Sequence, residues 1–165
     1  MRLFMKQQVF SWRDRFYIKD EYEQDKYYVE GELFSWGKKL HVFDMQGNEV
    51  AFIQQKVFSF LPKFHVYING EAIAEIVKEF TFLKPRYSIL GLDWNVSGDF
   101  WSHEYEIMEG NSSVVSIHKE WFRWGDSYVI DIVEGRNEVH VLAVVLAIDA
   151  VMAAQNAGAA GGGAH

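Results

Sequence analysis

The side chains that could perform acid–base or metal chemistry are scattered along this chain. Six histidines stand at positions 41, 65, 103, 118, 140 and 165, and none has the spacing to a partner ligand that a zinc site needs. His103 and Glu104 follow Asp99 closely enough to suggest a ligand cluster. Isolated polar residues at strand ends are the more common explanation of such a group.

No motif of a catalytic site is present in the sequence. The chain contains no cysteine, which excludes thiolate catalysis, disulfides and cysteine-based zinc sites. It also has no Gly-rich phosphate loop, nucleophile elbow or calcium loop. We therefore expect no catalytic residues, no metal site and no cofactor, and we interpret the protein as a non-enzyme.

Asp149 has the most unfavourable surroundings of the ionisable residues, because it lies in a long apolar run. A buried carboxylate is costly unless it has a partner. One interpretation is a gate or a proton-linked switch. The simpler one, which we favour, is a carboxylate that meets a hydroxyl, an indole or water where its helix emerges.

The element that carries Asp149 is predicted to be a helix from about 139 to 155. Residues Val141 to Ile148 are all apolar, so this helix would be hydrophobic on every side and must be surrounded. Its length of roughly 25 Å is short for a bilayer core of about 30 Å. We interpret it as buried in protein, with a single membrane span as the alternative. Residues 156–165, NAGAAGGGAH, are expected to form a flexible tail.

Length and composition indicate one domain, which we place at residues 1–155. The 165-residue chain is long enough for one core, and 49% hydrophobic residues exclude a disordered chain. The formal net charge of −7 argues against nucleic-acid binding. The N-terminus, MRLFMKQQVFSW, lacks the apolar core of a signal peptide. We expect a cytoplasmic monomer, with a peripheral position at the membrane as a further option.

An aromatic motif repeats along the chain before the helix. VFSW at 9–12, LFSW at 33–36 and VFSF at 57–60 are 24 residues apart, and weaker copies are EFTF at 79–82 and WFRW at 121–124. Each copy leads through a short turn into another alternating run, which is the pattern of strand, turn and strand. The alternating runs predict twelve strands, near 3–10, 15–19, 26–34, 38–44, 49–58, 63–69, 71–82, 86–90, 92–97, 103–109, 113–122 and 126–133.

Twelve successive antiparallel strands are predicted to close into a barrel, because closure removes the exposed sheet edges. About eight strands already give a barrel that its own side chains just fill. A twelve-stranded barrel therefore needs a plug, and the apolar helix is the candidate. The predicted fold class is mainly β, a twelve-stranded antiparallel barrel that encloses a C-terminal hydrophobic helix.

Many short segments, taken in order, resemble the LURP-one-related family. They are Met5-Lys6-Gln7 with Val9-Phe10-Ser11, Tyr28-Val29-Glu30-Gly31 with Phe34-Ser35, Asp44 to Val50, Gly91-Leu92-Asp93-Trp94, Gly98-Asp99-Phe100, Trp124-Gly125-Asp126-Ser127-Tyr128 and the helix Val141 to Val151. The resemblance covers residues 1 to about 155. It implies the tubby-like fold, distantly shared with phospholipid scramblases, and no enzymatic activity. Lipid binding by those relatives is an analogy of fold only.

Charged residues in the predicted turns segregate by turn number, and successive turns of an up-and-down barrel alternate between its two ends. The odd-numbered turns also hold Asp14, Asp99 and Asp126, but they carry the basic residues Arg13, Arg15, Lys38, Lys39, Lys63, Lys84, Arg86 and Arg123. The even-numbered turns also hold Lys19, Lys26 and Arg136, but they carry the acids Asp20, Glu21, Glu23, Asp25, Asp44, Glu49, Glu71, Asp93, Glu109, Glu134 and Glu138. This sorting predicts a basic rim and an acidic rim, although the polarity of turns in general accounts for part of it.

These features together predict a non-enzymatic, tubby-like interaction module. It would capture an anionic ligand, a lipid headgroup or an acidic protein partner on the basic rim. The candidate residues, as donors to phosphate or carboxylate, are Arg13, Arg15, Lys38, Lys39, Lys63, Lys84 and Arg86. The alternative is a membrane-associated, scramblase-like lipid-handling protein that uses the C-terminal helix as an anchor. An enzyme with an unrecognised pocket is a third hypothesis.

Overall fold

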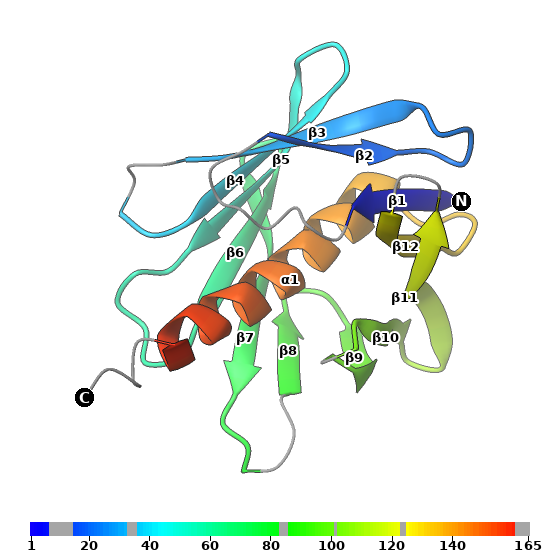
Figure 1. Ribbon diagram of the computed structural model, residues 1–165. Helices are drawn as coiled ribbons and strands as arrows, with labels where there is room; N and C mark the ends of the chain where they lie inside the picture. Colours follow the sequence, from blue (N-terminus) through cyan, green and yellow to red (C-terminus); the bar gives the residue numbers. More distant parts are fainter. Residues whose placement is uncertain (7–14, 33–35, 83–85, 101, 123–124, 161–165) are drawn as a thin grey trace.

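Twelve strands and one helix make up the computed structural model, which describes residues 1–6, 15–32, 36–82, 86–100, 102–122 and 125–160 (Figure 1). The strands are β1 (Arg2–Lys6), β2 (Phe16–Lys19), β3 (Asp25–Gly31), β4 (Lys39–Asp44), β5 (Glu49–Gln55), β6 (Lys63–Ile68), β7 (Glu71–Glu79), β8 (Arg86–Leu90), β9 (Trp94–Asp99), β10 (Glu104–Glu109), β11 (Ser112–Phe122) and β12 (Gly125–Ile132). The helix α1 spans Glu138–Ala160.

The strands form one closed antiparallel barrel in which each strand pairs with its neighbours in sequence. Closure comes from β1, which pairs with both β2 and β12, for example Leu3 with Ile130. Two seams are short, because β1 and β2 share only two residue pairs and β8 and β9 share one, Ser88 with Asn95. The predicted fold class, a twelve-stranded barrel with a C-terminal helix, is confirmed.

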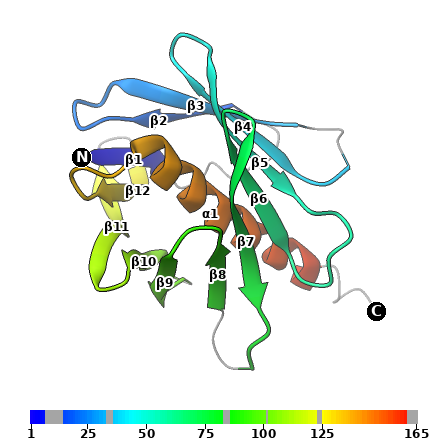
Figure 2. The ribbon, with the colours of Figure 1, turned by 180° about the vertical axis from the view of Figure 1, so that it is seen from behind.

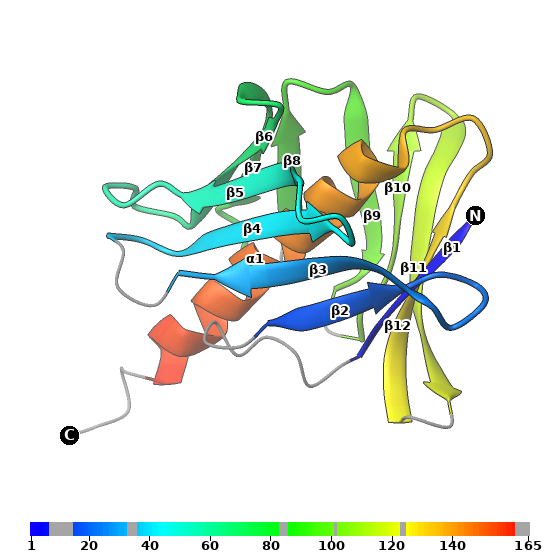
Figure 3. The ribbon, with the colours of Figure 1, turned by 90° about the horizontal axis from the view of Figure 1, so that it is seen from above.

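The helix runs through the barrel between the wall of β3 to β7 and the wall of β8 to β12, as the side, rear and top views show (Figures 1, 2 and 3). Its N-terminus is capped by Asn137, whose Oδ1 accepts a hydrogen bond of 3.1 Å from the His140 backbone N–H. The helix is longer than predicted, because residues 156–160 continue it. The last part of the predicted tail, 161–165, lies outside the described residues.

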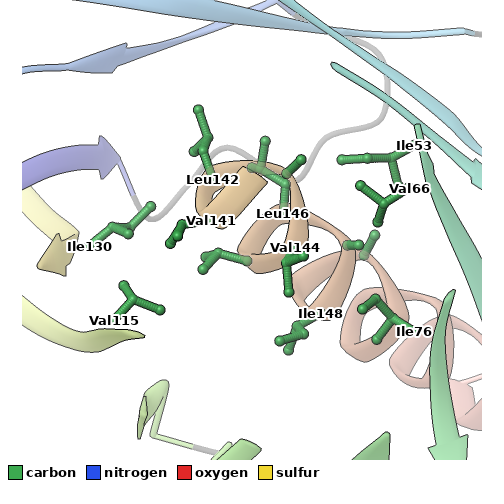
Figure 4. Close-up of a cluster of buried hydrophobic side chains, with 14 of the residues drawn as sticks. Ile53, Val66, Ile76, Val115, Ile130, Val141, Leu142, Val144, Leu146 and Ile148 are labelled. Carbon is green, nitrogen blue, oxygen red and sulfur yellow. The ribbon is translucent and has the colours of Figure 1, made fainter. Parts of the chain in front are cut away.

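The core is the contact between the apolar helix and the inward side chains of the strands. Residues 141–148 of the helix are at most 1% exposed. The helix packs chiefly on β5, β6 and β7. Figure 4 shows helix residues between side chains from both walls, among them Ile53 and Val66 on one side and Val115 and Ile130 on the other. The helix therefore fills the barrel, as the sequence predicts.

Several strands end earlier than predicted, and the difference falls on the aromatic repeat. β5 ends at Gln55 rather than 58, and β7 ends at Glu79 rather than 82. The hydrogen bond of 2.9 Å from the Lys56 backbone N–H to the Lys63 carbonyl closes a loop of residues 57–62. Residues 7–10 and 33–34, which we also predicted as strand, lie outside the described residues. The copies at 57–60 and 80–82 therefore lie in loops, whereas Trp121 and Phe122 of the last copy are the final residues of β11.

Candidate functional site

The barrel has two ends that differ in character. The odd rim is formed by the loops β1–β2, β3–β4, β5–β6, β7–β8, β9–β10 and β11–β12, and the even rim by the remaining turns together with the start of α1. In Figure 1 the β3–β4, β5–β6 and β7–β8 loops lie on the side where the C-terminal end of α1 emerges. This arrangement gathers each predicted set of turns at one end.

Three of the candidate basic residues on the odd rim are paired with acids that lie in a neighbouring strand or directly after it. Arg15 Nε donates to Glu30 Oε1 at 2.7 Å, and its guanidinium lies 4.5 Å from the centre of the Tyr28 ring. The Lys39 ammonium is 3.1 Å from Glu32. The remaining pair, at 3.2 Å, is Lys63 with Glu75. Part of the positive charge of this rim is therefore already balanced within the barrel.

The other candidates differ in exposure. Arg86 is exposed at the start of β8, opposite Glu79 in the β7–β8 register. Lys38 is partly buried, and burial lowers the pKa of its ammonium group. An anion beside this ammonium would offset the cost of desolvation. Arg13 and Lys84 lie outside the described residues.

The even rim is built from acids that hold the turns in shape. Asp20 Oδ1 accepts hydrogen bonds from the backbone N–H groups of Tyr22 and Gln24 at 2.9 and 3.0 Å. Glu138 contacts the Lys26 ammonium at 2.8 Å and accepts from the Tyr27 hydroxyl at 2.5 Å. The basic residues that the sequence places at this end all pair with acids: Lys19 with Asp25 at 2.6 Å, Lys26 with Glu138, and Arg136 with Glu109 at 2.5 Å.

Exposed aromatic side chains gather on the odd rim, and sequence reasoning missed them. We call this set the aromatic crown, and its members with their exposed fractions are Trp36 (82%), Phe58 (91%), Phe60 (95%), Phe80 (68%), Phe82 (91%) and Trp121 (78%). Every strongly exposed Phe or Trp of the described residues belongs to it. Each residue is part of a copy of the aromatic repeat, so the repeat itself was the signal that could have found the crown.

A buried polar cluster lies between the helix and β10. Asp149 is 4% exposed, and its Oδ1 is 3.8 Å from Nδ1 of His103, in the β9–β10 turn. These two atoms and the Tyr105 hydroxyl are buried without a hydrogen-bond partner among the described residues. His103 has φ of 54°, an uncommon value for a non-glycine residue, and its ring lies against that of Tyr128, tilted by 32° with 4.6 Å between the ring centres. Asp149 thus faces a hydroxyl and an imidazole, close to the simpler interpretation of the sequence.

Burial shifts the ionisation of this cluster. Desolvation raises the pKa of Asp149 above its ordinary value of 3.8, although His103 and Tyr105 oppose the shift. Desolvation also raises the pKa of Tyr105 well above 10, and it raises that of Tyr87 to about 12, in both cases with a further contribution from Asp149. The Tyr87 hydroxyl donates to Gln155 Oε1 at 2.7 Å. Burial in this cluster therefore works against the charged form of Asp149.

The ligand cluster that the spacing of Asp99, His103 and Glu104 could suggest is not assembled. Asp99 accepts a hydrogen bond of 2.7 Å from the Ser102 hydroxyl, whereas His103 faces Asp149 in the helix. Across the residues that the structure describes, no group of three His, Asp or Glu side chains is placed to hold a metal ion.

One groove lies where β1 and β2 separate. Its volume is about 400 Å³, and it is lined by Phe4, Lys6, Phe16, Tyr17, Lys19, Glu23 and Ser127. The Lys19 ammonium is bonded to the Glu23 carbonyl at 3.3 Å and to Asp25 at 2.6 Å. This described lining contains no pair of a nucleophile and a general base.

The helix α1 is also the segment that a membrane anchor would require. Residues Glu138–Gln155 are long and apolar enough to cross a bilayer, and 67% of them are buried inside the barrel. The core helix of a globular protein meets the same length and composition criteria, so this property alone does not indicate a membrane span.

The fold defines a class of closed antiparallel barrels that are filled by their own C-terminal helix. The chain belongs to the LURP-one-related family, whose model matches residues 1–149. A relative from Bacillus subtilis (strain 168), described as the uncharacterized protein YxjI, is 38% identical over 152 residues, which are 92% of this chain and 94% of YxjI. The predicted family membership is confirmed.

A solved structure supports the fold. The crystal structure of a protein from Arabidopsis thaliana superposes with a TM-score of 0.62 and covers 91% of this chain and 90% of the plant protein, at 14% identity. At that identity the likeness concerns the fold alone. The predicted kinship to tubby proteins and scramblases, and the predicted ligand-binding residues, stay predictions.

Proposed function

We propose that this protein is a non-enzymatic module that binds an anionic partner on the odd rim. The proposal rests on one observation: closure of the barrel brings basic residues from several separate hairpins to one end of an acidic chain. Arg15, Lys38, Lys39, Lys63 and Arg86 all lie at this end. Such segregation focuses positive potential on one surface.

The candidate residues would act as hydrogen-bond donors. Arg86 is exposed and Lys38 is partly desolvated, so both gain from a phosphate or carboxylate oxygen. Arg15, Lys39 and Lys63 keep their carboxylate partners and would share their remaining donors with the ligand. The anion would thus meet several hydrogen-bond donors, and the side chains of three of them are already held in place by carboxylate partners.

The described residues favour binding over catalysis. In the polar cluster, Oδ1 of Asp149, Nδ1 of His103 and the Tyr105 hydroxyl are buried, so these atoms do not form an open site, although the His103 side chain itself is 27% exposed. The groove between β1 and β2 combines apolar walls with a lysine that is paired with Asp25. A binding role needs neither an activated nucleophile nor a cofactor, and it agrees with the placement of charge at the rim.

The test is a charge reversal on the odd rim. The variant Lys38→Glu/Lys39→Glu/Lys84→Glu/Arg86→Glu is titrated with inositol hexakisphosphate, a soluble polyanion, in a calorimeter. We expect at least about tenfold weaker affinity than for the wild type. Affinity of the wild type should fall as salt rises, because exposed charges are screened.

The matched control reverses charges on the even rim, with Glu21→Lys/Glu23→Lys/Asp25→Lys. This variant should keep the wild-type affinity, or gain slightly from the more positive net charge. Equal loss of affinity in both variants, or no binding of the polyanion at any salt concentration, would contradict the proposal.

A further inference from the structure

We infer that the aromatic crown is a membrane-docking surface, with which the odd rim enters the interface of an anionic phospholipid bilayer. The inference rests on the proposed function, because it assigns the anionic partner of the same rim to a lipid surface. It adds an observation that charge does not explain, the exposure of six large aromatic side chains at one end of the barrel.

The exposed aromatics contribute nothing visible to the fold. Phe58, Phe60 and Phe82 are each more than 90% exposed, so they bury almost none of their apolar surface. Phe80 and Phe82 contact each other edge to face at 5.4 Å, at the tip of their loop. Large apolar side chains that gather on an exposed surface typically mark an interaction site. The crown therefore has the properties of an interaction surface for another molecule.

The crown loops have the architecture of a bilayer-inserting tip. In the β5–β6 loop, Val57-Phe58-Ser59-Phe60-Leu61-Pro62 is apolar but for one serine, and Lys56 and Lys63 flank it at the base. A hydrogen bond between the backbones of these two lysines closes the base. The β7–β8 segment repeats the order, with Lys78 before Phe80-Thr81-Phe82 and Lys84 after it. Apolar side chains can enter the membrane interface while flanking lysines stay among the headgroups.

Neighbouring crown loops are fixed to one another, so the surface is preorganised. Gln55 and Lys38 join the β3–β4 and β5–β6 loops through the hydrogen bond from Gln55 N to Lys38 O at 2.8 Å and that from Lys38 N to Gln55 Oε1 at 3.1 Å. Gly37 has φ of 80°, and a Cβ there would lie 2.8 Å from Val57 Cγ2. Only glycine allows this close approach without a shift. The Pro62 carbonyl accepts from the Lys78 N–H at 3.4 Å and links the next loop.

Charge favours a bilayer over a second copy of this chain. If two copies met crown to crown, the basic residues of both odd rims would face each other and repel. The even rim, which would have to meet the crown in a head-to-tail contact, carries one strongly exposed aromatic residue, Tyr22, among its acids. Tryptophan at the edge of an apolar patch and lysine at its base are the residues that membrane interfaces prefer. An anionic lipid surface complements both features of the odd rim.

The experiment removes the apolar tips and keeps every charge. The full-length variant Phe58→Ser/Phe60→Ser/Phe80→Ser/Phe82→Ser is sedimented with vesicles of equal parts phosphatidylcholine and phosphatidylglycerol. We expect at least about tenfold weaker partitioning than for the wild type, and most of the loss should persist at high salt, where the electrostatic part is screened. Its affinity for inositol hexakisphosphate should stay unchanged.

The matched control removes exposed apolar side chains from the even rim, with Tyr22→Ser/Met45→Ser/Leu90→Ser/Val133→Ser, and should bind vesicles like the wild type. Wild-type partitioning by the crown variant would overturn the inference while leaving anion binding intact. Self-association of the wild type without vesicles, abolished in the crown variant, would also overturn it and assign the crown to a second copy. Failure of the charge-reversal variant to weaken polyanion binding, with the crown effect present, would instead overturn the proposed function alone.

Discussion

The two ends of the barrel use their polar and apolar residues in opposite ways. On the even rim, Asp20 and Glu138 bond to backbone or neighbouring side chains and hold the turns and the start of the helix. On the odd rim, Phe58 and Phe60 protrude into solvent at 91% and 95% exposure. The acids of the even end thus support the fold, whereas the exposed aromatic residues of the odd end are the part for which we propose a contact. Under that proposal, stability and binding depend on opposite ends of one molecule.

The largest expected effect comes from breaking the even rim at the start of the helix. Glu138→Lys removes the contacts with Lys26 and Tyr27 and places a cation at the positive end of the helix dipole. We expect a loss of about 2–4 kcal/mol in the free energy of unfolding, measured by urea denaturation.

The stability of Glu138→Lys is to be compared with that of two other variants. Glu138→Gln keeps the shape of the side chain and should lose less. The crown variant Phe58→Ser/Phe60→Ser/Phe80→Ser/Phe82→Ser alters four residues of the opposite rim and should stay within about 0.5 kcal/mol of the wild type. A crown variant as unstable as Glu138→Lys would remove the distinction between the two ends.

A smaller effect is expected at the β2–β3 turn. Asp20→Ala removes the acceptor of two backbone N–H groups, those of Tyr22 and Gln24, and should cost about 1–2 kcal/mol. Its counterpart on the odd rim is Ser59→Ala, in the loop closed by Lys56 and Lys63, which should change the midpoint of thermal unfolding very little. Equal destabilisation by both changes would show that the odd loops also support the fold.

The smallest expected effect is a gain in stability rather than a loss, and it concerns Asp149, which is buried beneath the odd rim. Because burial raises the pKa of Asp149, the folded protein holds this proton more tightly than the unfolded chain. The resulting stability is complete below about pH 4 and is lost as the pH rises through the pKa of the folded state. Asp149→Asn cannot ionise, so it should be more stable than the wild type at neutral pH, by on the order of 1 kcal/mol.

The measurement is the free energy of unfolding of both proteins between acidic and mildly alkaline pH. The difference should grow with pH. The groups that face Asp149 are His103 from the β9–β10 turn, Tyr105 from β10 and Tyr87 from β8. His103→Gln serves as a control, because it removes the imidazole beside Asp149 and keeps Asp149 itself. Parallel pH profiles for Asp149→Asn and the wild type would mean that Asp149 is charged in the folded state.

Much of the fold follows from patterns within the sequence. Alternating runs and turn residues such as Asn69-Gly70, both with positive φ, locate most of the hairpins. The apolar run of Val141 to Ile148 can only lie at the centre, and the structure buries it there. The alternation of the turns between the two ends also follows from closure, while the binding role of the basic set stays a prediction. These features depend on local spacing, which a sequence displays directly.

The features that the sequence conceals depend on register. Phe58 and Phe82 belong to β-favouring aromatic runs, so periodicity assigns them to strands, although their strands have lost pairing partners by that point. Whether Lys63 lies beside Glu75 is decided by the pairing of β6 with β7. The meeting of His103 with Asp149 joins a turn to a helix across the core. None of these contacts has a local signature.

The position of the plug after all twelve strands also determines when the barrel can be filled. The strands are synthesised before α1, so their inward apolar faces at first have no helix to cover them. At roughly 5–20 residues per second, synthesis of the 23-residue helix takes about 1–5 s. During that interval the nascent strands are open to wrong pairing, and the arrival of α1 converts them into a filled barrel.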